Sequence, residues 1–282
     1  MRFLSSVVGS FSRGAAANPT VSMMEACFAH EGLDWRYVNC EVDEEQLGAA
    51  VAGAHAMGWR GFNCSTPHKQ TVIQLIDDLG ASARIGRAVN CVVRTDAGWV
   101  GHNTDGVGFV RSAQELVDLD GVDSLVIGSG GAAHAIAIEV AGAGAHVVRI
   151  AGRNGSTAAS LARLVDTETS ADGSVVEWTR PLVVPPTVRL VVNATSVGMS
   201  PHHEELIEVD WDSVSSLAVV ADVVPMPANT QFLRAARAAG TATIDGRGML
   251  VNQAAENIFL WTGTWPDTSV MRAALDDALA DD

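Results

Sequence analysis

The chain reads Ser124-Leu125-Val126-Ile127-Gly128-Ser129-Gly130-Gly131-Ala132-Ala133 at the point that decides its fold. The apolar run 124–127 predicts a short buried strand, and an alanine-rich helix to residue 143 should follow the glycines. A second apolar run, 146–151, predicts the next strand. Strand, glycine turn, helix and strand form the context in which a G-x-G-x-x-G/A pattern binds a dinucleotide. The alternative is a tight strand–helix turn without a ligand, and we favour the dinucleotide site.

This turn predicts how a cofactor would be held. Gly128 allows the tight turn, Gly130 lets the backbone approach a pyrophosphate, and Ala133 lets the helix pack closely on the sheet. The N–H groups at the start of the helix would meet the phosphates. The expected cofactor contacts in this turn are Gly128, Ser129, Gly130, Gly131 and Ala132.

The end of the second strand distinguishes between the two nicotinamide cofactors. An NAD site usually has a carboxylate here for the ribose hydroxyls, but no Asp or Glu lies between Glu139 and Asp166. Arg153 follows the strand instead, where a guanidinium could meet the 2′-phosphate of NADP. The sequence therefore favours NADP over NAD, although Arg153 could also be an ordinary surface residue.

The rest of the chain alternates in the same way. Strands are expected at 3–8, 35–42, 60–63, 89–94, 99–102, 190–193 and 218–222, with a loop of small residues at 9–18. Helices are expected at 19–29, 44–57, 105–119, 230–239 and 267–279, with one more carrying Gln253. A turn at Asp96-Ala97-Gly98 predicts a hairpin. This alternation predicts an α/β fold with a mostly parallel sheet in its N-terminal part.

One further stretch, Gly61-Phe62-Asn63-Cys64-Ser65-Thr66-Pro67-His68-Lys69, holds the only lysine in the sequence. An amine can be deprotonated near neutral pH, whereas a guanidinium cannot. Thr66 is expected to cap a helix and Pro67 to open it. Lys69 would then lie in the first turn, where the helix dipole disfavours an ammonium. Lys69 is therefore a candidate for proton transfer, and the alternative is an ordinary surface lysine.

Composition excludes several classes of function. The chain has 282 residues, is 48% hydrophobic and carries a formal net charge of −15. Nucleic acid and anionic membranes are therefore not expected as partners, and an anionic substrate would need a locally electropositive pocket. The four cysteines share no C-x-x-C spacing, which indicates reduced thiols without a metal. Without a signal peptide or a membrane-spanning run, a cytoplasmic protein is expected.

Seven landmarks in order resemble the shikimate dehydrogenase family along nearly the whole chain. They are Asn63 to Lys69, Ala88-Val89-Asn90, Asn103-Thr104-Asp105-Gly106, Gly128 to Ala133, Asn193 to Met199, Asp222-Val223-Val224, and Gly246 to Leu250 with Gln253. The resemblance implies a substrate domain, 1–105 plus 247–282, and a Rossmann-like NADP-binding domain, 106–246. It also implies reversible NADP-dependent conversion of 3-dehydroshikimate to shikimate, in aromatic amino acid biosynthesis, by a monomer or homodimer.

The resemblance assigns roles to individual residues. Lys69 and Asp105 would be the catalytic pair. The substrate contacts would be Asn18, Ser65, Asn90 and Gln253, and further cofactor contacts would be Asn193, Thr195, Val223 and Gly246. Each has a structural alternative: Asp105 could cap a helix, Asn90 could end a strand, Ser65 could bond to the local backbone, and Gln253 could be an ordinary helix residue.

The sequence departs from the family pattern at the first loop. The family has Ser-x-Ser-Pro, whose hydroxyls bind the substrate carboxylate, and this chain has Ala16-Ala17-Asn18-Pro19, so that Ser10 or Ser12 would have to compensate. The family's tyrosine after the Asp-x-x motif is Pro225 here. We therefore expect a high KM for shikimate or a preference for another polyhydroxylated ring. Quinate dehydrogenase and a regulatory protein that binds dinucleotide without turnover remain alternatives.

Overall fold

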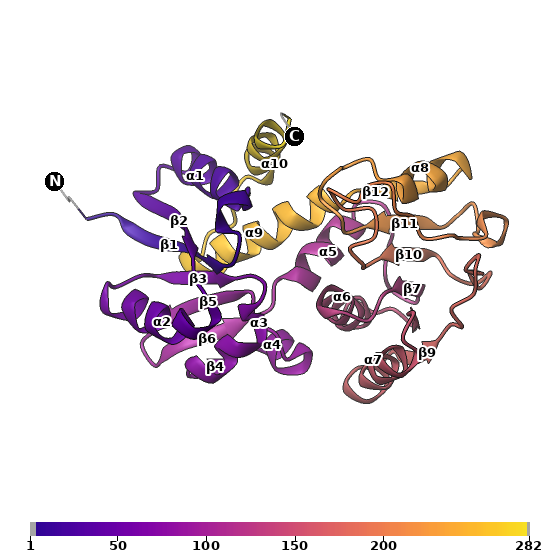
Figure 1. Cartoon of the computed structure of the whole chain (residues 1–282), viewed down its shortest axis with the longest axis horizontal. Helices are drawn as coiled ribbons and strands as arrows, with labels where there is room; N and C mark the ends of the chain where they lie inside the picture. Colours follow the sequence, from indigo (N-terminus) through magenta and orange to yellow (C-terminus); the bar gives the residue numbers. More distant parts are fainter. Residues whose placement is uncertain (1–3, 281–282) are drawn as a thin grey trace. The chain divides into compact units, whose positions relative to one another are not determined.

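The computed structural model describes residues 4–280 and divides the chain into two compact units (Figure 1). The first unit comprises residues 1–104 and 253–282, and the second comprises residues 105–252. The chain leaves the first unit one residue before the predicted boundary. It returns six residues later than predicted, because the long helix α9, Gly246–Thr262, continues across the return point.

The first unit is built on a mixed sheet in which one strand runs against the rest. Its strands are β1 (Ser6–Ser12), β2 (Trp35–Glu41), β3 (Gly61–Cys64), β4 (Asp78–Leu79), β5 (Cys91–Thr95) and β6 (Gly98–His102). Their order is β2-β1-β3-β5-β6-β4. Only β5 is antiparallel to its neighbours among the described strands. The mostly parallel sheet and the β5–β6 hairpin are therefore confirmed.

Helices and an aromatic core complete this unit. The helices are α1 (Thr20–His30), α2 (Leu47–Ala56), α3 (His68–Thr71), α4 (Ala81–Gly86) and α10 (Thr268–Ala278), with 3₁₀ turns η1 (Ala15–Ala17), η2 (Glu44–Gln46) and η3 (Val72–Leu75). α1 and α10 pack against each other (Figure 1). In the core the ring of Phe62 lies 4.7 Å from that of Phe11 and 5.2 Å from that of Trp99.

Two predictions for this unit were wrong. The expected loop 9–18 is a strand as far as Ser12, because β1 is paired with β2 on one side and β3 on the other; residue 3 of the expected first strand lies outside the described residues. Thr66 does not cap the lysine helix. Pro67 stands at the cap position without a side-chain hydrogen bond, and the helix is only the four residues of α3. So few peptide dipoles make a small field, and the dipole argument for Lys69 loses its force.

The second unit is a doubly wound parallel sheet. Its strands are β7 (Asp123–Ile127), β8 (Val147–Ala151), β9 (Asp172–Val175), β10 (Leu190–Asn193), β11 (Val219–Asp222) and β12 (Ala242–Ile244). Their order is β12-β11-β10-β7-β8-β9 with parallel pairing throughout. This is the 3-2-1-4-5-6 order of dinucleotide-binding sheets, in which ligands bind where the order reverses, here between β7 and β10.

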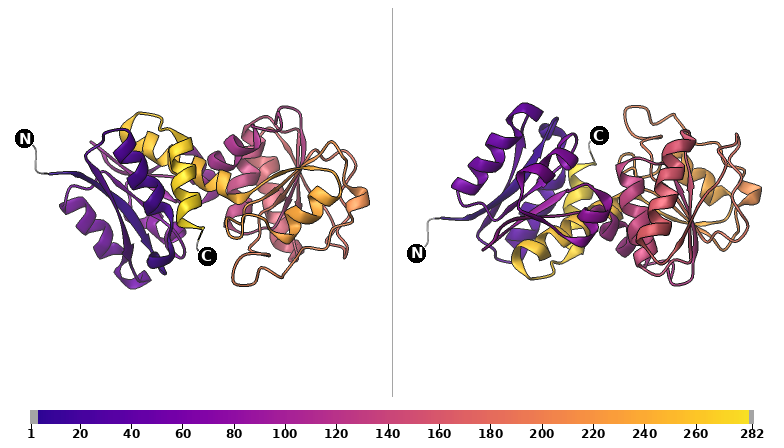
Figure 2. Two further views of the ribbon diagram at one scale, coloured as in Figure 1. Left: turned by 90° about the horizontal axis from the view of Figure 1, so that it is seen from above. Right: turned by 90° about the horizontal axis from the view of Figure 1, so that it is seen from below.

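The helices of the second unit position that crevice. They are α5 (Asp105–Ala113), α6 (Gly131–Gly142), α7 (Gly155–Glu168), α8 (Gln231–Ala238) and the first part of α9, with the 3₁₀ turn η4 (Trp211–Ser213). α6 packs against β7 and β8, α7 against β8 and β9, and α8 against β11 and β12, so that helices cover both faces of the sheet (Figure 2). The helix predicted to reach residue 119 ends at Ala113, because the chain turns there and buries Leu119.

Candidate active site

The glycine turn between β7 and α6 has the geometry of a phosphate-binding site. Gly128 has a φ of +126°, and a Cβ there would lie 3.0 Å from the carbonyl oxygen of Ala194, so that only glycine fits without strain. Gly130 precedes α6 without any side-chain cap. A Cβ at Gly130 or Gly131 would meet nothing within 4 Å. The backbone at the start of α6 is therefore uncrowded and borders the open pocket, as an anion site requires.

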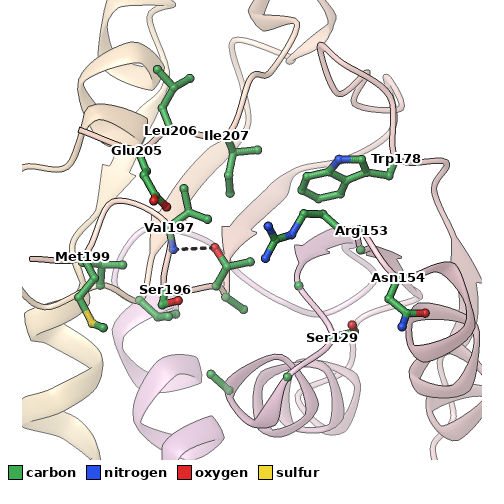
Figure 3. Close-up of a pocket in the computed structure, with 18 of the residues that line it drawn as sticks. Ser129, Arg153, Asn154, Trp178, Ser196, Val197, Met199, Glu205, Leu206 and Ile207 are labelled. Atoms are coloured by element: carbon green, nitrogen blue, oxygen red, sulfur yellow. Dashed lines mark hydrogen bonds between the residues drawn. The ribbon is translucent and has the colours of Figure 1, made fainter. Parts of the chain in front are cut away.

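A pocket of about 990 Å³ opens at this turn, and all the residues that line it belong to the second unit (Figure 3). It lies at the carboxyl ends of β7, β8, β10 and β11. Eight of the predicted cofactor residues line it: Gly128, Ser129, Gly130, Gly131, Ala132, Arg153, Thr195 and Val223. The turn, the arginine and the loop after β10 are thus brought together around one cavity.

Arg153 gives this cavity a positive charge at the end of β8. Figure 3 shows its side chain directed into the pocket. It forms no ion pair within residues 4–280. The neighbouring Asn154 caps α7, since its Oδ1 accepts hydrogen bonds from the N–H groups of Ser156 and Thr157 at 3.1 and 3.3 Å. The residues present here fit the extra phosphate of NADP better than the ribose hydroxyls of NAD.

Two predicted cofactor residues lie behind the pocket instead of in its lining. Asn193 is fully buried, and its Oδ1 accepts hydrogen bonds from the N–H and hydroxyl groups of Thr195 at 3.0 and 2.7 Å. It thereby sets the path of the loop that carries Thr195. At Gly246 a Cβ would lie 2.4 Å from the carbonyl oxygen of Val224, so this glycine lets α9 pass close behind the pocket wall.

Asp222 anchors the same loop from β11. Its carboxylate is 1% exposed and accepts hydrogen bonds from Asn193 Nδ2 at 3.0 Å, the Val224 N–H at 3.0 Å and the Thr230 hydroxyl at 2.7 Å. Burial raises the pKa of Asp222 to about 6, although these hydrogen bonds act in the opposite direction. One carboxylate thus connects β10, the start of α8 and the segment that lines the pocket.

In the first unit a buried polar cluster forms around Asn90. Its Oδ1 accepts a hydrogen bond from the N–H of Thr104 at 2.8 Å, and its Nδ2 donates to Gln253 Oε1 at 3.3 Å. Thr104 donates its hydroxyl to Asn257 at 2.8 Å, and Asn257 donates to Gln253 at 3.4 Å. Two predicted substrate residues, Asn90 and Gln253, are therefore in direct contact although 163 positions separate them.

Both predicted catalytic residues are tied to this cluster through the backbone. The carbonyl oxygen of Lys69 accepts a hydrogen bond from the N–H of Val89, the residue before Asn90, at 2.8 Å. Asp105 directly follows Thr104 in the chain and begins α5 in the second unit. Lys69 lies on α3, next to the fully buried His68, whose Nε2 contacts the Val42 carbonyl at 2.8 Å.

The first loop holds the other predicted substrate residues. Asn18 Nδ2 donates to the Ser10 hydroxyl at 3.3 Å and to Asn39 Oδ1 at 3.4 Å, and its Oδ1 accepts the N–H of Thr20 at 3.1 Å. Both the amide nitrogen and the amide oxygen of Asn18 thus form hydrogen bonds to other residues of the first unit. The side chain of Ser65 is exposed at the start of the turn into α3.

A second chain of hydrogen bonds connects β2 to the Asn90 cluster. Tyr37 is 3% exposed and donates its hydroxyl to Asn63 Oδ1 at 2.9 Å, and Asn63 Nδ2 donates to the Asn90 carbonyl at 2.8 Å. The hydrogen bonds that run from Tyr37 through Asn63 to Asn90 are therefore made by uncharged amides and a hydroxyl.

Sequence reasoning missed part of the cofactor pocket. The lining also includes Trp178, Thr179 and Arg180, which follow β9, and residues 205–208 from a long irregular segment. No strand or helix pattern marks these positions. Their place in the pocket follows from contacts between segments that lie far apart in the sequence.

A pocket at the reversal point of a doubly wound sheet, beside a glycine turn that opens a helix, places the second unit in the class of dinucleotide-binding domains. Family models for the shikimate dehydrogenase substrate binding domain and the shikimate 5′-dehydrogenase C-terminal domain match residues 16–92 and 246–275. The shikimate dehydrogenase (NADP(+)) of Desulforamulus reducens is 35% identical over 97% of this chain and 96% of its own length.

Solved structures are also similar to this chain over nearly its whole length. The 5-ketofructose reductase of Gluconobacter sp. strain CHM43 is 43% identical with a TM-score of 0.94, covering 98% of this chain and 99% of that one. The shikimate 5-dehydrogenase of Thermus thermophilus, solved with NADP(H) and shikimate, is 27% identical with a TM-score of 0.86, covering 97% of this chain and 100% of that one.

The chain belongs to the shikimate dehydrogenase family. The predicted family, its α/β fold with a Rossmann-like unit, and its class, an NADP-linked oxidoreductase, are confirmed. Among the described residues, none of the helices is both long and apolar enough to span a bilayer.

Proposed function

We propose that this protein catalyses reversible hydride transfer between NADP(H) and a hydroxyl-bearing ring carbon of shikimate or a related cyclic polyhydroxy compound. The observation that carries the proposal is the Asn90 cluster. It links Lys69, by the hydrogen bond of its carbonyl to Val89, with Thr104, the residue before Asp105. The backbone of Lys69 and the residue that precedes Asp105 are thus both held by the hydrogen bonds of the Asn90 cluster in the first unit.

Each residue has a defined role in this proposal. Lys69 and Asp105 hold the reacting oxygen and manage its proton. Asn90 and Gln253 bind ring hydroxyls, with their amides oriented by Thr104 and Asn257. The bound cofactor supplies or accepts the hydride.

The cofactor would be held by the second unit. The N–H groups at the start of α6 bind the pyrophosphate, and Arg153 binds the 2′-phosphate. Thr195 and Val223 form the wall toward the nicotinamide, in the path that Asn193 and Asp222 impose. Residues 105–252 therefore act as the nucleotide-binding domain, and the other unit as the substrate domain.

A second candidate substrate is an uncharged ketosugar, and the first loop favours it. An ionised carboxylate that leaves water needs charge-assisted hydrogen-bond donors. Asn18, which stands at the position of the family's serine, donates its amide to Ser10 and Asn39. The first-loop groups Ser10, Asn18 and Asn39 are uncharged, and such groups suit a sugar hydroxyl better than a carboxylate. The similarity to a 5-ketofructose reductase supports the same substrate class.

NADPH oxidation by the purified protein with 3-dehydroshikimate, 3-dehydroquinate and 5-ketofructose separates these possibilities. A kcat/KM of about 10⁴ M⁻¹s⁻¹ or more is expected for the physiological substrate. If 3-dehydroshikimate gives a kcat/KM of this size, the proposal of a cyclic hydroxy acid substrate is supported. If only 5-ketofructose does, the ketosugar is the substrate instead. Tight NADPH binding with no turnover of any compound would favour the regulatory protein instead.

We also propose a cytoplasmic location and a monomeric or homodimeric state. The four cysteines are free, as expected in a reducing compartment. Cell fractionation and light scattering of the purified protein test the two statements, and a stable tetramer or a secreted protein would contradict them.

A further inference from the structure

The stretch Trp178-Thr179-Arg180 enters the cofactor pocket from a part of the chain that no motif marks. It follows β9 and lines the same cavity as Arg153, which follows β8. Both arginine side chains are exposed, and neither forms an ion pair or a side-chain hydrogen bond within residues 4–280. Two guanidinium groups without an ion pair in the described residues therefore line one pocket, in a chain whose formal net charge is −15.

The acidic residues of the pocket do not neutralise these arginines. Glu205 and Glu208 also line it, but no ion pair joins either carboxylate to Arg153 or Arg180 in the described part of the chain. Figure 3 shows Glu205 beside Val197 and Met199, whereas Arg153 lies on the side of Trp178. Arg153 and Glu205 thus lie apart in this view of the cavity.

We propose that Arg180 is a second specificity-determining residue for the cofactor, binding the 2′-phosphate of the adenosine ribose together with Arg153. The assignment rests on the proposed use of NADP(H). A phosphate monoester carries a charge of about −1.5 to −2 at pH 7, so one guanidinium leaves it incompletely neutralised. A guanidinium forms bidentate bonds to phosphate oxygens, and two of them from different loops can hold the group between them.

Trp178 gives this site a flat aromatic wall. Its ring lines the pocket, and its side chain points into it in Figure 3. Its buried Nε1 has no hydrogen-bond partner among residues 4–280, and the ring packs against the hydrophobic core of the second unit. An aromatic face stacks on an adenine. Because adenine is common to NADPH and NADH, Trp178 should support both cofactors, whereas Arg180 should act only on the phosphorylated one.

Calorimetric titration of the full chain with NADPH and with NADH tests the proposal. The variants are Arg180→Ala, Arg153→Ala and Trp178→Ala. Arg163→Ala is the matched control, because Arg163 is exposed on α7 and does not line the pocket. Arg180→Ala should weaken NADPH binding by about tenfold or more, the loss expected for a charge-assisted contact, and should change NADH binding less than about twofold. Trp178→Ala should weaken both cofactors, and Arg163→Ala neither.

The titrations separate failure of this inference from failure of the function. If the unmutated protein prefers NADPH and Arg180→Ala leaves the NADPH-to-NADH ratio of Kd values unchanged, the role of Arg180 is refuted. If the unmutated protein binds neither cofactor, the proposed function fails first. Arg180→Lys, which keeps the charge and loses the bidentate geometry, should restore part of the NADPH affinity. Equal weakening of both cofactors in Arg180→Ala would also overturn the assignment.

Discussion

Replacing Asp222 with asparagine should stabilise the protein at alkaline pH. The buried carboxylate has its pKa raised from 3.8 to about 6, chiefly by burial. Each pKa unit corresponds to about 1.36 kcal/mol, so keeping this group ionised in the folded state costs about 3 kcal/mol. Asparagine has nearly the same shape, and its Oδ1 can accept from Asn193 and Val224 while its Nδ2 donates to Thr230.

The sign of the pH dependence follows from the raised pKa. The folded protein binds a proton at Asp222 more tightly than the unfolded chain does, so the stabilisation is fully present below 3.8 and is lost as pH rises through about 6. At pH 8 the asparagine variant should therefore unfold with a free energy higher by up to about 3 kcal/mol. At pH 5 protonation of Asp222 makes the unmutated protein more stable by about 1.4 kcal/mol than at pH 8. The difference in unfolding free energy between the variant and the unmutated protein should therefore fall by that amount.

Urea unfolding followed by circular dichroism at pH 8 and pH 5 measures both quantities. Other titrating groups are shared by the two proteins and cancel in the difference. Asp212→Asn is the control, because Asp212 is exposed, and it should change the unfolding free energy by less than about 0.5 kcal/mol. An advantage of Asp222→Asn that is the same at both pH values, or a loss of stability at pH 8, would refute the reasoning.

Two further substitutions test the framework around the site. Tyr37→Phe removes the donor to Asn63 Oδ1 in a buried network and should lower the free energy of unfolding by about 1–3 kcal/mol in urea titrations; an unchanged midpoint would show that water replaces the hydroxyl. Gly128→Ala adds a Cβ 3.0 Å from a carbonyl oxygen at a φ of +126°, and calorimetry should show NADPH affinity reduced by at least about tenfold. The control is Gly240→Ala, at a φ of +85° with open space around it, which should be strained but should bind NADPH as tightly as the unmutated protein. Equal NADPH affinities for the two variants would contradict the role of the Gly128 turn in binding the cofactor.

The cofactor unit was largely predictable because its signal is local. A short apolar strand, Gly128 in a conformation that favours glycine, and an uncapped helix are all properties of one stretch. The polarity of the substrate cluster was predictable only by resemblance. Nothing local indicates that Asn90 should contact Gln253 across 163 positions.

The remaining differences arise where tertiary contacts override local pattern. Gly9, Ser10 and Ser12 are typical of a loop, but two neighbouring strands hold this stretch in β1 and bury Phe11. Asn193 looks like a ligand contact after a strand, yet it turns inward because Asp222 accepts its amide. Arg180 lies in an irregular segment, so its place beside the pocket becomes visible only when the chain is folded.

Lys69 carries the central claim, because the sequence contains no other lysine. The most direct test compares the unmutated protein with Lys69→Ala, using the best substrate for kcat/KM and calorimetry for NADPH binding. The account predicts that kcat/KM falls by about 10²-fold to 10⁴-fold, while the Kd for NADPH changes less than about twofold, which is within about 0.4 kcal/mol. A variant that turns over substrate at nearly the unmutated rate would contradict it.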